Sequence, residues 1–298
     1  MSESAERTLP VYVIGDSHAL PYKNMLFRDK WTGQSIVTRS KYISGLTAFD
    51  FYARETQEFL PSIIECLEYE GLVRDGKATH LSKDTIDFSI ARASDLPITP
   101  PLIMFTVGDI DVRSILLRVF TDRYDFVPPF DFPYPVLDRP IVPWDVVADL
   151  IEQRLSPFIE GLVQLQAAGF NRLYVQLVVP PTTNESKSSQ INGISCPLSV
   201  RSKLVASFNR LLAEKVEALG IAAIDIWPQI TGPDGYLLSD CEFDGVHVAP
   251  RVAKMQLEQL LEHAINHAWE AVNHVRYEMF YRMACGLAPL ESPNGNAP

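Results

Sequence analysis

The 298-residue chain contains few cysteines and no long apolar run. Its four cysteines are scattered without a C-x-x-C pair, which favours reduced, structural thiols over a metal or redox motif. No segment approaches the roughly eighteen apolar residues typical of a membrane helix. The polar residues 1–10 lack the apolar stretch of a secretory signal. We therefore expect a soluble, cytoplasmic protein with no membrane partner.

Positive charge is also scarce. The chain has 26 Lys and Arg against 37 Asp and Glu, which gives a net charge of −11 and a pI near 5.0. An acidic surface repels nucleic acids and anionic membranes unless basic residues gather locally. The densest basic stretch, residues 28–41, is interleaved with Asp29 and polar side chains. We expect no nucleic-acid partner, and the sequence leaves the oligomeric state open.

What the chain does contain is an alternation of strand-length and helix-length apolar segments. The strand-like segments are continuously apolar, which is typical of parallel strands covered on both faces. The five expected strands are Leu9–Ile14, Ser35–Thr38, Pro101–Val107, Leu173–Val179 and Ile221–Trp227. Strands alternating with helices form right-handed βαβ units, so the pattern predicts an α/β fold with a doubly wound, mainly parallel five-stranded sheet.

Two long segments between these strands have apolar residues near the helical period of 3.6. They are Trp144–Ala168 and Ser199–Leu219, and the glycines that follow, Gly169 and Gly220, are expected to end them. Proline lacks the N–H that a helix interior needs, so Pro157 is expected to kink or divide the first helix.

The sequence predicts a single domain over residues 9–286, with a flexible N-terminus at residues 1–8 and a flexible tail at 287–298. Residues 252–283 form a long C-terminal helical region, expected to be more than one helix. Residues 121–147 are rich in proline and aromatic side chains and follow neither periodicity. Aromatic content favours packing over disorder, so we expect a lid-like insertion there.

Two polar turns follow expected strands directly: Gly15-Asp16-Ser17-His18 and Gly108-Asp109-Ile110-Asp111. Carboxyl ends of parallel strands share one edge of a sheet, where ligands bind, so both turns should face one crevice. Ser17 stands where a helix is expected to begin, and backbone N–H groups there can stabilise an oxyanion. The alternative is that Asp16 and Ser17 only cap this helix, which such residues often do.

A second element with possible chemistry precedes the last helical region. A serine nucleophile needs a base to remove its proton, and a carboxylate to fix the tautomer of that base. Asp244 and His247, three residues apart on one turn, form such a pair by themselves. The alternative is a surface turn with a histidine that caps the helix. His18 is expected to point away from His247.

Together these segments resemble the SGNH (GDSL-type) hydrolase family. The first block of the family corresponds to the turn that holds Ser17, and the last, Asp-x-x-His, to Asp244 and His247. The glycine of the second block corresponds to Gly45, and the third block, Gly-x-Asn-Asp, to residues 108–111. The order of the blocks agrees with the family over residues 9–265.

The resemblance implies a three-layer α/β/α, flavodoxin-like domain that cleaves a small-molecule or glycan ester through an acyl-serine intermediate. It implies Ser17 as the nucleophile, His247 as general base and then general acid, and Asp244 as the residue that orients His247. The backbone N–H groups of Ser17 and Gly45 would contribute to the oxyanion hole. No cofactor and no metal are implied.

One position departs from the family pattern. Ile110 stands where the family has the asparagine of its oxyanion hole, and loss of one such donor can cost about 2.7–4 kcal/mol of transition-state stabilisation. Arg113 either supplies the missing positive charge or pairs with Asp111 to shape the loop. Gly108, Asp111 and Arg113 are therefore further candidates for the oxyanion hole or for substrate binding.

Three other functions use the same residues. A metal-dependent phosphoesterase would take Asp16 and His18 as an Asp-x-His motif with Asp109, but no Gly-Asn-His element follows. An O-acyltransferase would pass the acyl group to a hydroxyl instead of water. A non-catalytic glycan- or metabolite-binding module would explain Ile110, yet binding alone does not require a nucleophile, a base and a carboxylate together.

Overall fold

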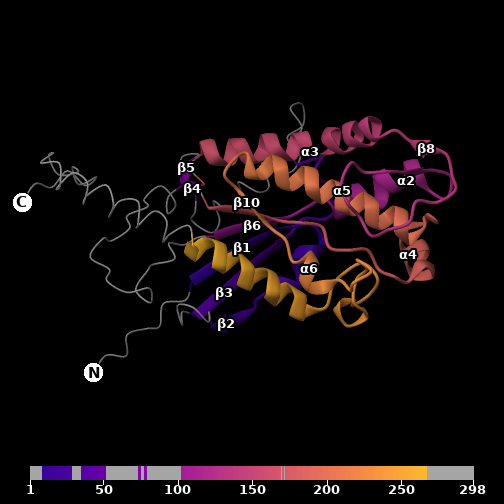
Figure 1. Cartoon of the computed structure of the whole chain (residues 1–298). Coiled ribbons are helices and arrows are strands. Elements are labelled where there is room, and N and C mark those ends of the chain that lie inside the picture. The colour runs from indigo at the N-terminus through magenta and orange to yellow at the C-terminus, as the bar shows by residue number, and fades with distance from the viewer. Residues whose placement is uncertain are drawn as a thin grey trace, which may run out of the picture.

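Five parallel strands and one antiparallel edge strand form the central sheet (Figure 1). The computed structural model describes residues 9–28, 35–51, 73–74, 77–78, 102–168, 170 and 172–266. The strands of the sheet are β1 (Leu9–Gly15), β2 (Leu26–Arg28), β3 (Ser35–Tyr42), β6 (Leu102–Thr106), β9 (Leu173–Gln176) and β10 (Ala222–Ile224). Their order, β10-β9-β6-β1-β3-β2, contains the flavodoxin-like order of five parallel strands.

All five expected strands are present, and the predicted α/β fold is confirmed. The prediction missed β2, which pairs antiparallel with β3 at the edge of the sheet. This strand is three residues long and none of them is buried, so it carries none of the continuous hydrophobicity that marks the parallel strands.

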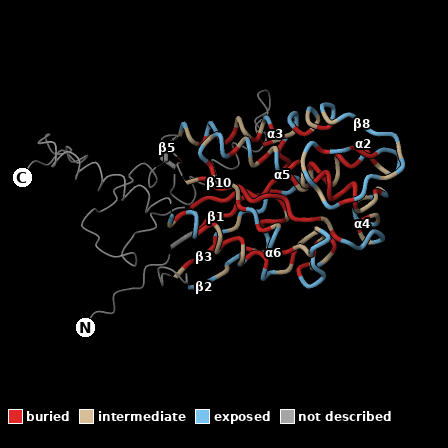
Figure 2. The backbone as a smooth tube through the Cα atoms, in the orientation of Figure 1, coloured by how far each residue is buried: buried red, intermediate tan, exposed pale blue. Residues whose placement is uncertain are grey.

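Helices cover both faces of the sheet and create three layers (Figure 1). α3 (Trp144–Ala167) and α5 (Leu198–Glu217) pack on the face that carries Tyr12, Ile14 and Phe105. A helix over residues 250–266 packs on the opposite face. Successive strand side chains alternate between the two cores because the side-chain period of a strand is two. Figure 2 shows the central strands buried between the outer helices, whose outer surfaces are exposed.

α3 continues through Pro157, so of the two predicted effects, a kink or a division of the helix, the division does not occur. Leu155, Phe158 and Leu162 are fully buried around it. Most helix stability in proteins comes from packing of an apolar face, and here that packing outweighs one lost backbone hydrogen bond. Gly220 follows α5 with φ +71°, as expected of a helix stop, while Gly169 lies outside the described residues.

Short elements connect the layers. The helical ones are η1 (Ser17–Tyr22), η3 (Asp111–Leu116), α2 (Leu117–Phe120), α4 (Glu185–Asn192), α6 (Trp227–Ile230) and η4 (Ser239–Cys241). The paired short strands are β4 (Val73–Arg74) with β5 (Lys77–Ala78), and β7 (Asp125–Phe126) with β8 (Ile141–Val142). η3 is a π-helical turn, a form that is frequent at functional sites.

The proline- and aromatic-rich segment is packed against α5 through a buried ion pair. Asp125 accepts hydrogen bonds from the backbone N–H groups of Phe126 and Leu137, at 2.7 and 2.8 Å. Its Oδ1 lies 2.5 Å from Nζ of Lys203 on α5, and both side chains are fully buried. The expected flexible residues 1–8 and 287–298, and the C-terminal helical region beyond residue 266, lie outside the described residues.

Among the residues that the structure describes, no helix has the length and hydrophobicity to cross a membrane.

Removal of one partner from a buried ion pair leaves the other charge uncompensated, which costs about 3–5 kcal/mol. Lys203→Met should therefore lower the free energy of unfolding by about that amount, measured by urea denaturation. Lys215 lies on the same helix and forms a partly exposed pair with Glu152. Lys215→Met is the control, with an expected loss below about 1 kcal/mol. Equal losses in the two variants would show that the buried pair does not hold the segment.

Candidate active site

Ser17 lies at the carboxyl end of β1, where the sheet backbone is tightly packed. Gly15 pairs with Thr106 of β6, and a Cβ atom at Gly15 would lie only 2.2 Å from the Thr106 carbonyl oxygen. The close approach therefore requires glycine. Asp16 caps η1 by accepting a 2.9 Å hydrogen bond from the backbone N–H of His18. The capping role thus falls to Asp16, and the half-buried Ser17 is not needed for it.

Asp244 and His247 form the expected pair in the loop between η4 and the helix over residues 250–266. Nδ1 of His247 lies 2.7 Å from Oδ2 of Asp244. Oδ1 of Asp244 accepts hydrogen bonds from the backbone N–H groups of His247 and Val246, at 2.7 and 3.0 Å. Partial burial opposes ionisation of Asp244, but these hydrogen bonds outweigh it and lower its pKa to about 2.

The ionised Asp244 fixes the tautomer of His247. A carboxylate only accepts hydrogen bonds, so Nδ1 carries the proton and Nε2 keeps its lone pair. Nε2 is buried and has no hydrogen-bond partner among the described residues. His247 can therefore take up a proton at Nε2. Within the same part of the chain, no hydrogen bond joins it to Ser17.

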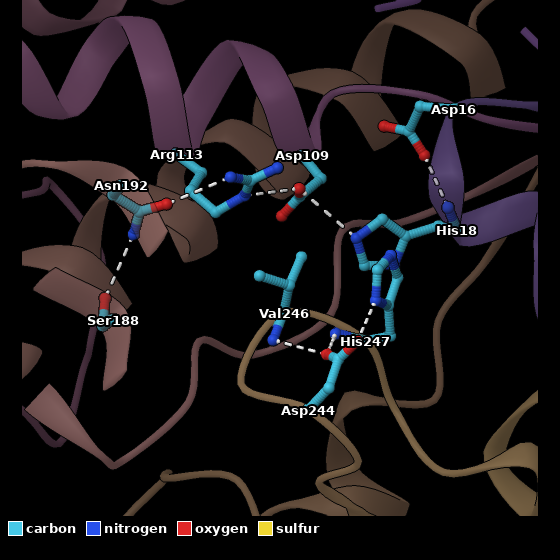
Figure 3. Close-up of polar contacts among 9 residues, drawn as sticks. All are labelled: Asp16, His18, Asp109, Arg113, Ser188, Asn192, Asp244, Val246 and His247. Atoms are coloured by element: carbon cyan, nitrogen blue, oxygen red, sulfur yellow. Dashed lines mark hydrogen bonds and ion pairs between the residues drawn. The ribbon is translucent and has the colours of Figure 1, made fainter. Parts of the chain in front are cut away.

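His18 lies against His247, so the prediction that it points away is wrong (Figure 3). The ring centroids of the two histidines are 5.1 Å apart, and His18 is buried. Its Nε2 lies 3.3 Å from Oδ2 of Asp109, in the turn after β6. Burial alone would lower the pKa of His18, but the carboxylates of Asp109 and, to a smaller extent, Asp16 outweigh burial and raise it to about 9.

Asp109 has a second cationic partner in Arg113. Nε of Arg113 lies 2.8 Å from the same Oδ2, and its Nη1 donates to Asn192 of α4 at 3.1 Å (Figure 3). Burial opposes ionisation of Asp109, but the two cations hold its pKa well below the usual range. The expected pairing of Arg113 with Asp111 is wrong. Residues four apart share a helix face whereas residues two apart do not, which favours Asp109 as the partner.

Asp111 instead holds the loop that contains Gly45. Its buried carboxylate accepts hydrogen bonds from the backbone N–H groups of Ala48 and Phe49, at 2.6 and 3.4 Å. Burial outweighs these bonds and raises the pKa of Asp111 to about 7. Ile43 in the same loop donates to the Gly15 carbonyl at 2.8 Å. The loop is thereby fixed beside β1, and Gly45 within it is exposed with φ +75°.

Gly108 and Ile110, the remaining residues of the third block, lie between β6 and η3. Gly108 has φ +106°, and a Cβ atom there would lie 2.5 Å from the ring of Phe208 on α5. Ile110 is half-buried and directly precedes η3. The sequence indicated that the turns of His18 and Asp109 lie close together, because both turns follow neighbouring parallel strands. It did not indicate the direction in which either side chain points.

An open cleft adjoins these residues. Asp109 and Arg113 line one side of it, and Gly245 and Val246, between Asp244 and His247, line another. Arg201 of α5 also lines the cleft, and no motif in the sequence singles it out. Among the described residues, no group of three or more His, Cys, Asp or Glu side chains is arranged to hold a metal ion.

The predicted charge of His18 can be tested through stability. Its folded-state pKa of about 9 exceeds the ordinary 6.5, so its contribution is complete below pH 6.5 and lost as the pH rises through 9. Asp16, with a pKa raised to about 6, adds almost no change above pH 7, whereas Asp111, with a pKa raised to about 7, adds a fall of about 0.4 kcal/mol. From pH 7 to pH 9 the free energy of unfolding should fall by about 2 kcal/mol.

In His18→Gln most of this fall should disappear, leaving only the small part due to Asp111, measured by urea denaturation at both pH values. His263→Gln, which removes an exposed histidine, is the control and should keep the wild-type fall. A fall of unchanged size in His18→Gln would contradict the ion pair with Asp109.

No protein-family model and no curated protein matches the chain. Similar solved structures include a GDSL-like lipase from Bacteroides thetaiotaomicron, at 15% identity over 87% of this chain and 88% of that chain, with a TM-score of 0.44. A lipase/acylhydrolase from Enterococcus faecalis has 12% identity, coverage of 95% and 100%, and a TM-score of 0.41. A member of the lipolytic G-D-S-L family from Veillonella parvula has 11% identity, coverage of 85% and 97%, and a TM-score of 0.40. GDSL-type proteins, which the sequence blocks resemble, are thus represented among the similar structures.

Proposed function

We propose that this chain is a serine-dependent hydrolase that cleaves a small ester, or an acylated sugar or metabolite, through an acyl-Ser17 intermediate. The observation that carries the proposal is the Asp244–His247 pair, whose Nε2 is buried without a partner among the described residues. The contact between the rings of His18 and His247 brings this base to the turn that contains Ser17. A base beside a hydroxyl at a helix start is the arrangement of nucleophilic catalysis.

In the proposed reaction, Nε2 of His247 takes the proton of the Ser17 hydroxyl as its oxygen attacks the ester carbonyl. The tetrahedral intermediate collapses when the imidazolium returns this proton to the leaving alcohol, and the acyl group stays on Ser17. Water then attacks the acyl-enzyme, again with His247 as base, and the acid leaves with Ser17 restored. Asp244 keeps the tautomer correct and stabilises the imidazolium at each step.

The oxyanion would be stabilised by backbone N–H groups and by nearby positive charge. Ser17 is the first residue of η1, and the first N–H groups of a helix have no acceptor within it. Gly45 would supply a second N–H from the loop that Asp111 fixes. The His18 imidazolium, next to Ser17 in the chain, adds positive charge in the site that has Ile110 in place of asparagine. Arg113 would add further positive charge from the wall of the cleft that it lines.

Covalent labelling with a fluorophosphonate probe tests the nucleophile. Wild type should be labelled, and Ser17→Ala should not, because the probe reacts with the activated hydroxyl. His247→Ala should be labelled far more slowly. Ser156→Ala, which changes an exposed serine on α3, is the control and should be labelled like wild type. Labelling that persists in Ser17→Ala would exclude Ser17 as the nucleophile.

Asp244→Asn tests the pair separately from the nucleophile. An amide can donate to Nδ1 and favour the wrong tautomer, so kcat for an activated ester such as 4-nitrophenyl acetate should fall by about 10⁴-fold. Asp240→Asn, four residues earlier and exposed in its pair with Arg251, is the control. It should change kcat less than twofold. A loss below tenfold in Asp244→Asn would exclude Asp244 as the residue that orients His247.

A further inference from the structure

Arg201 is a buried cation in the wall of the cleft beside the candidate active site. Only 3% of it is exposed, and it lies near the start of α5. Its Nε donates to the Cys196 carbonyl at 3.1 Å, and its Nη1 to the Thr182 carbonyl at 3.0 Å. Its Nη2 is buried and has no hydrogen-bond partner among the described residues. Such an unpaired buried donor costs free energy unless an acceptor arrives.

The charge of Arg201 is not neutralised by a bonded acid within the described residues. Both acceptors are backbone carbonyls, and burial lowers its pKa. Glu185 acts on the guanidinium only through space, and its Oε1 accepts a hydrogen bond from the backbone N–H of Leu198. A buried charge without an ionic partner is costly, which favours a bound anion.

The other charges of the cleft cancel one another. Asp109 and Arg113 both line the cleft and form an ion pair with each other. Asp109 also contacts His18, which does not line the cleft. Arg201 therefore gives the cleft a net positive charge, although the whole chain has a net charge of −11. A planar guanidinium is suited to carboxylates because its N–H groups match two carboxylate oxygens.

The rest of the wall is mainly apolar. Val112, Leu117, Val205 and Val246 are among its lining residues. An aliphatic chain with an anionic end fits this combination of walls and charge.

We propose that the cleft binds a carboxylate on the substrate through Arg201, so that the ester presented to Ser17 is a small anionic one with a short aliphatic chain. The catalytic part of this statement rests on the proposed function of Ser17. Binding of the carboxylate does not rest on that function, because Arg201 lies on α5 and would hold the carboxylate without any covalent step at Ser17.

The test uses two matched ligands in the full chain with Ser17→Ala, where no turnover occurs. Monomethyl glutarate carries one ester and one carboxylate, and dimethyl glutarate replaces the carboxylate with a neutral ester. By isothermal titration calorimetry, the monomethyl ester should bind roughly 10- to 100-fold more tightly, as expected for hydrogen bonds to a charged group. Adding Arg201→Met should abolish this preference.

Arg210→Met provides the matched control, because Arg210 lies on the same helix but is exposed and pairs with Glu214. This control should keep the preference. If Arg201→Met does not unfold cooperatively on heating, Arg201→Lys replaces it and should reduce the preference, since the planar fork is lost.

Equal binding of the two ligands, no measurable binding of either, or a preference of unchanged size after substitution of Arg201 would each overturn the proposal. Because the assay lacks Ser17, its result is independent of fluorophosphonate labelling. Failure of carboxylate binding and failure of the proposed nucleophile are therefore distinguishable.

Discussion

The arrangement of the candidate site depends on the carboxylate of Asp109, which contacts two cations at once. His18 follows β1 and Arg113 lies on η3, so a single acceptor joins the turn after β1 to the turn after β6. Arg113 extends the connection to α4 through Asn192. Burial of the His18 imidazolium would be costly without this partner. With the pair formed, His18 remains beside Ser17 and against the ring of His247.

This contact is possible because the parallel strands bring their carboxyl ends to one edge. β1 lies between β3 and β6, and the direction of strand order changes there, which is where ligands bind in doubly wound sheets. Gly15 allows the β1 backbone to approach Thr106 closely. Asp111 then holds the Gly45 loop at the same edge. Backbone packing thus sets the positions of the turns, and the carboxylates set the directions of their side chains.

The sequence predicted the fold well because its strongest signals are local. Continuously apolar segments marked the five parallel strands, and the residues after β1 and β6 were correctly expected at one edge. The exposed β2 escaped prediction because three residues without an apolar run give no periodic signal. The sequence did not show that α3 continues past Pro157, because the cost of the proline is local, while the packing that offsets it involves residues from the sheet and other helices.

Individual residues of the candidate site could be predicted from the sequence, but contacts between residues far apart in the sequence could not. Asp244 and His247 are close in sequence, so their pairing followed from their spacing. The partner of His18 is 91 residues away, and no local pattern states which way either side chain points. Arg201 has no motif at all, because its importance comes from burial and from the neutral acceptors around it. Both are properties of tertiary structure.

The central claim is that Ser17 carries the acyl group during turnover. Its most direct test is intact-protein and peptide mass spectrometry after rapid acid quench of the enzyme with an activated ester. The expected result is a mass increase of one acyl group, mapped to the peptide that contains Ser17 and absent in Ser17→Ala. An acyl group mapped to another residue, or turnover in Ser17→Ala at the wild-type rate, would contradict it.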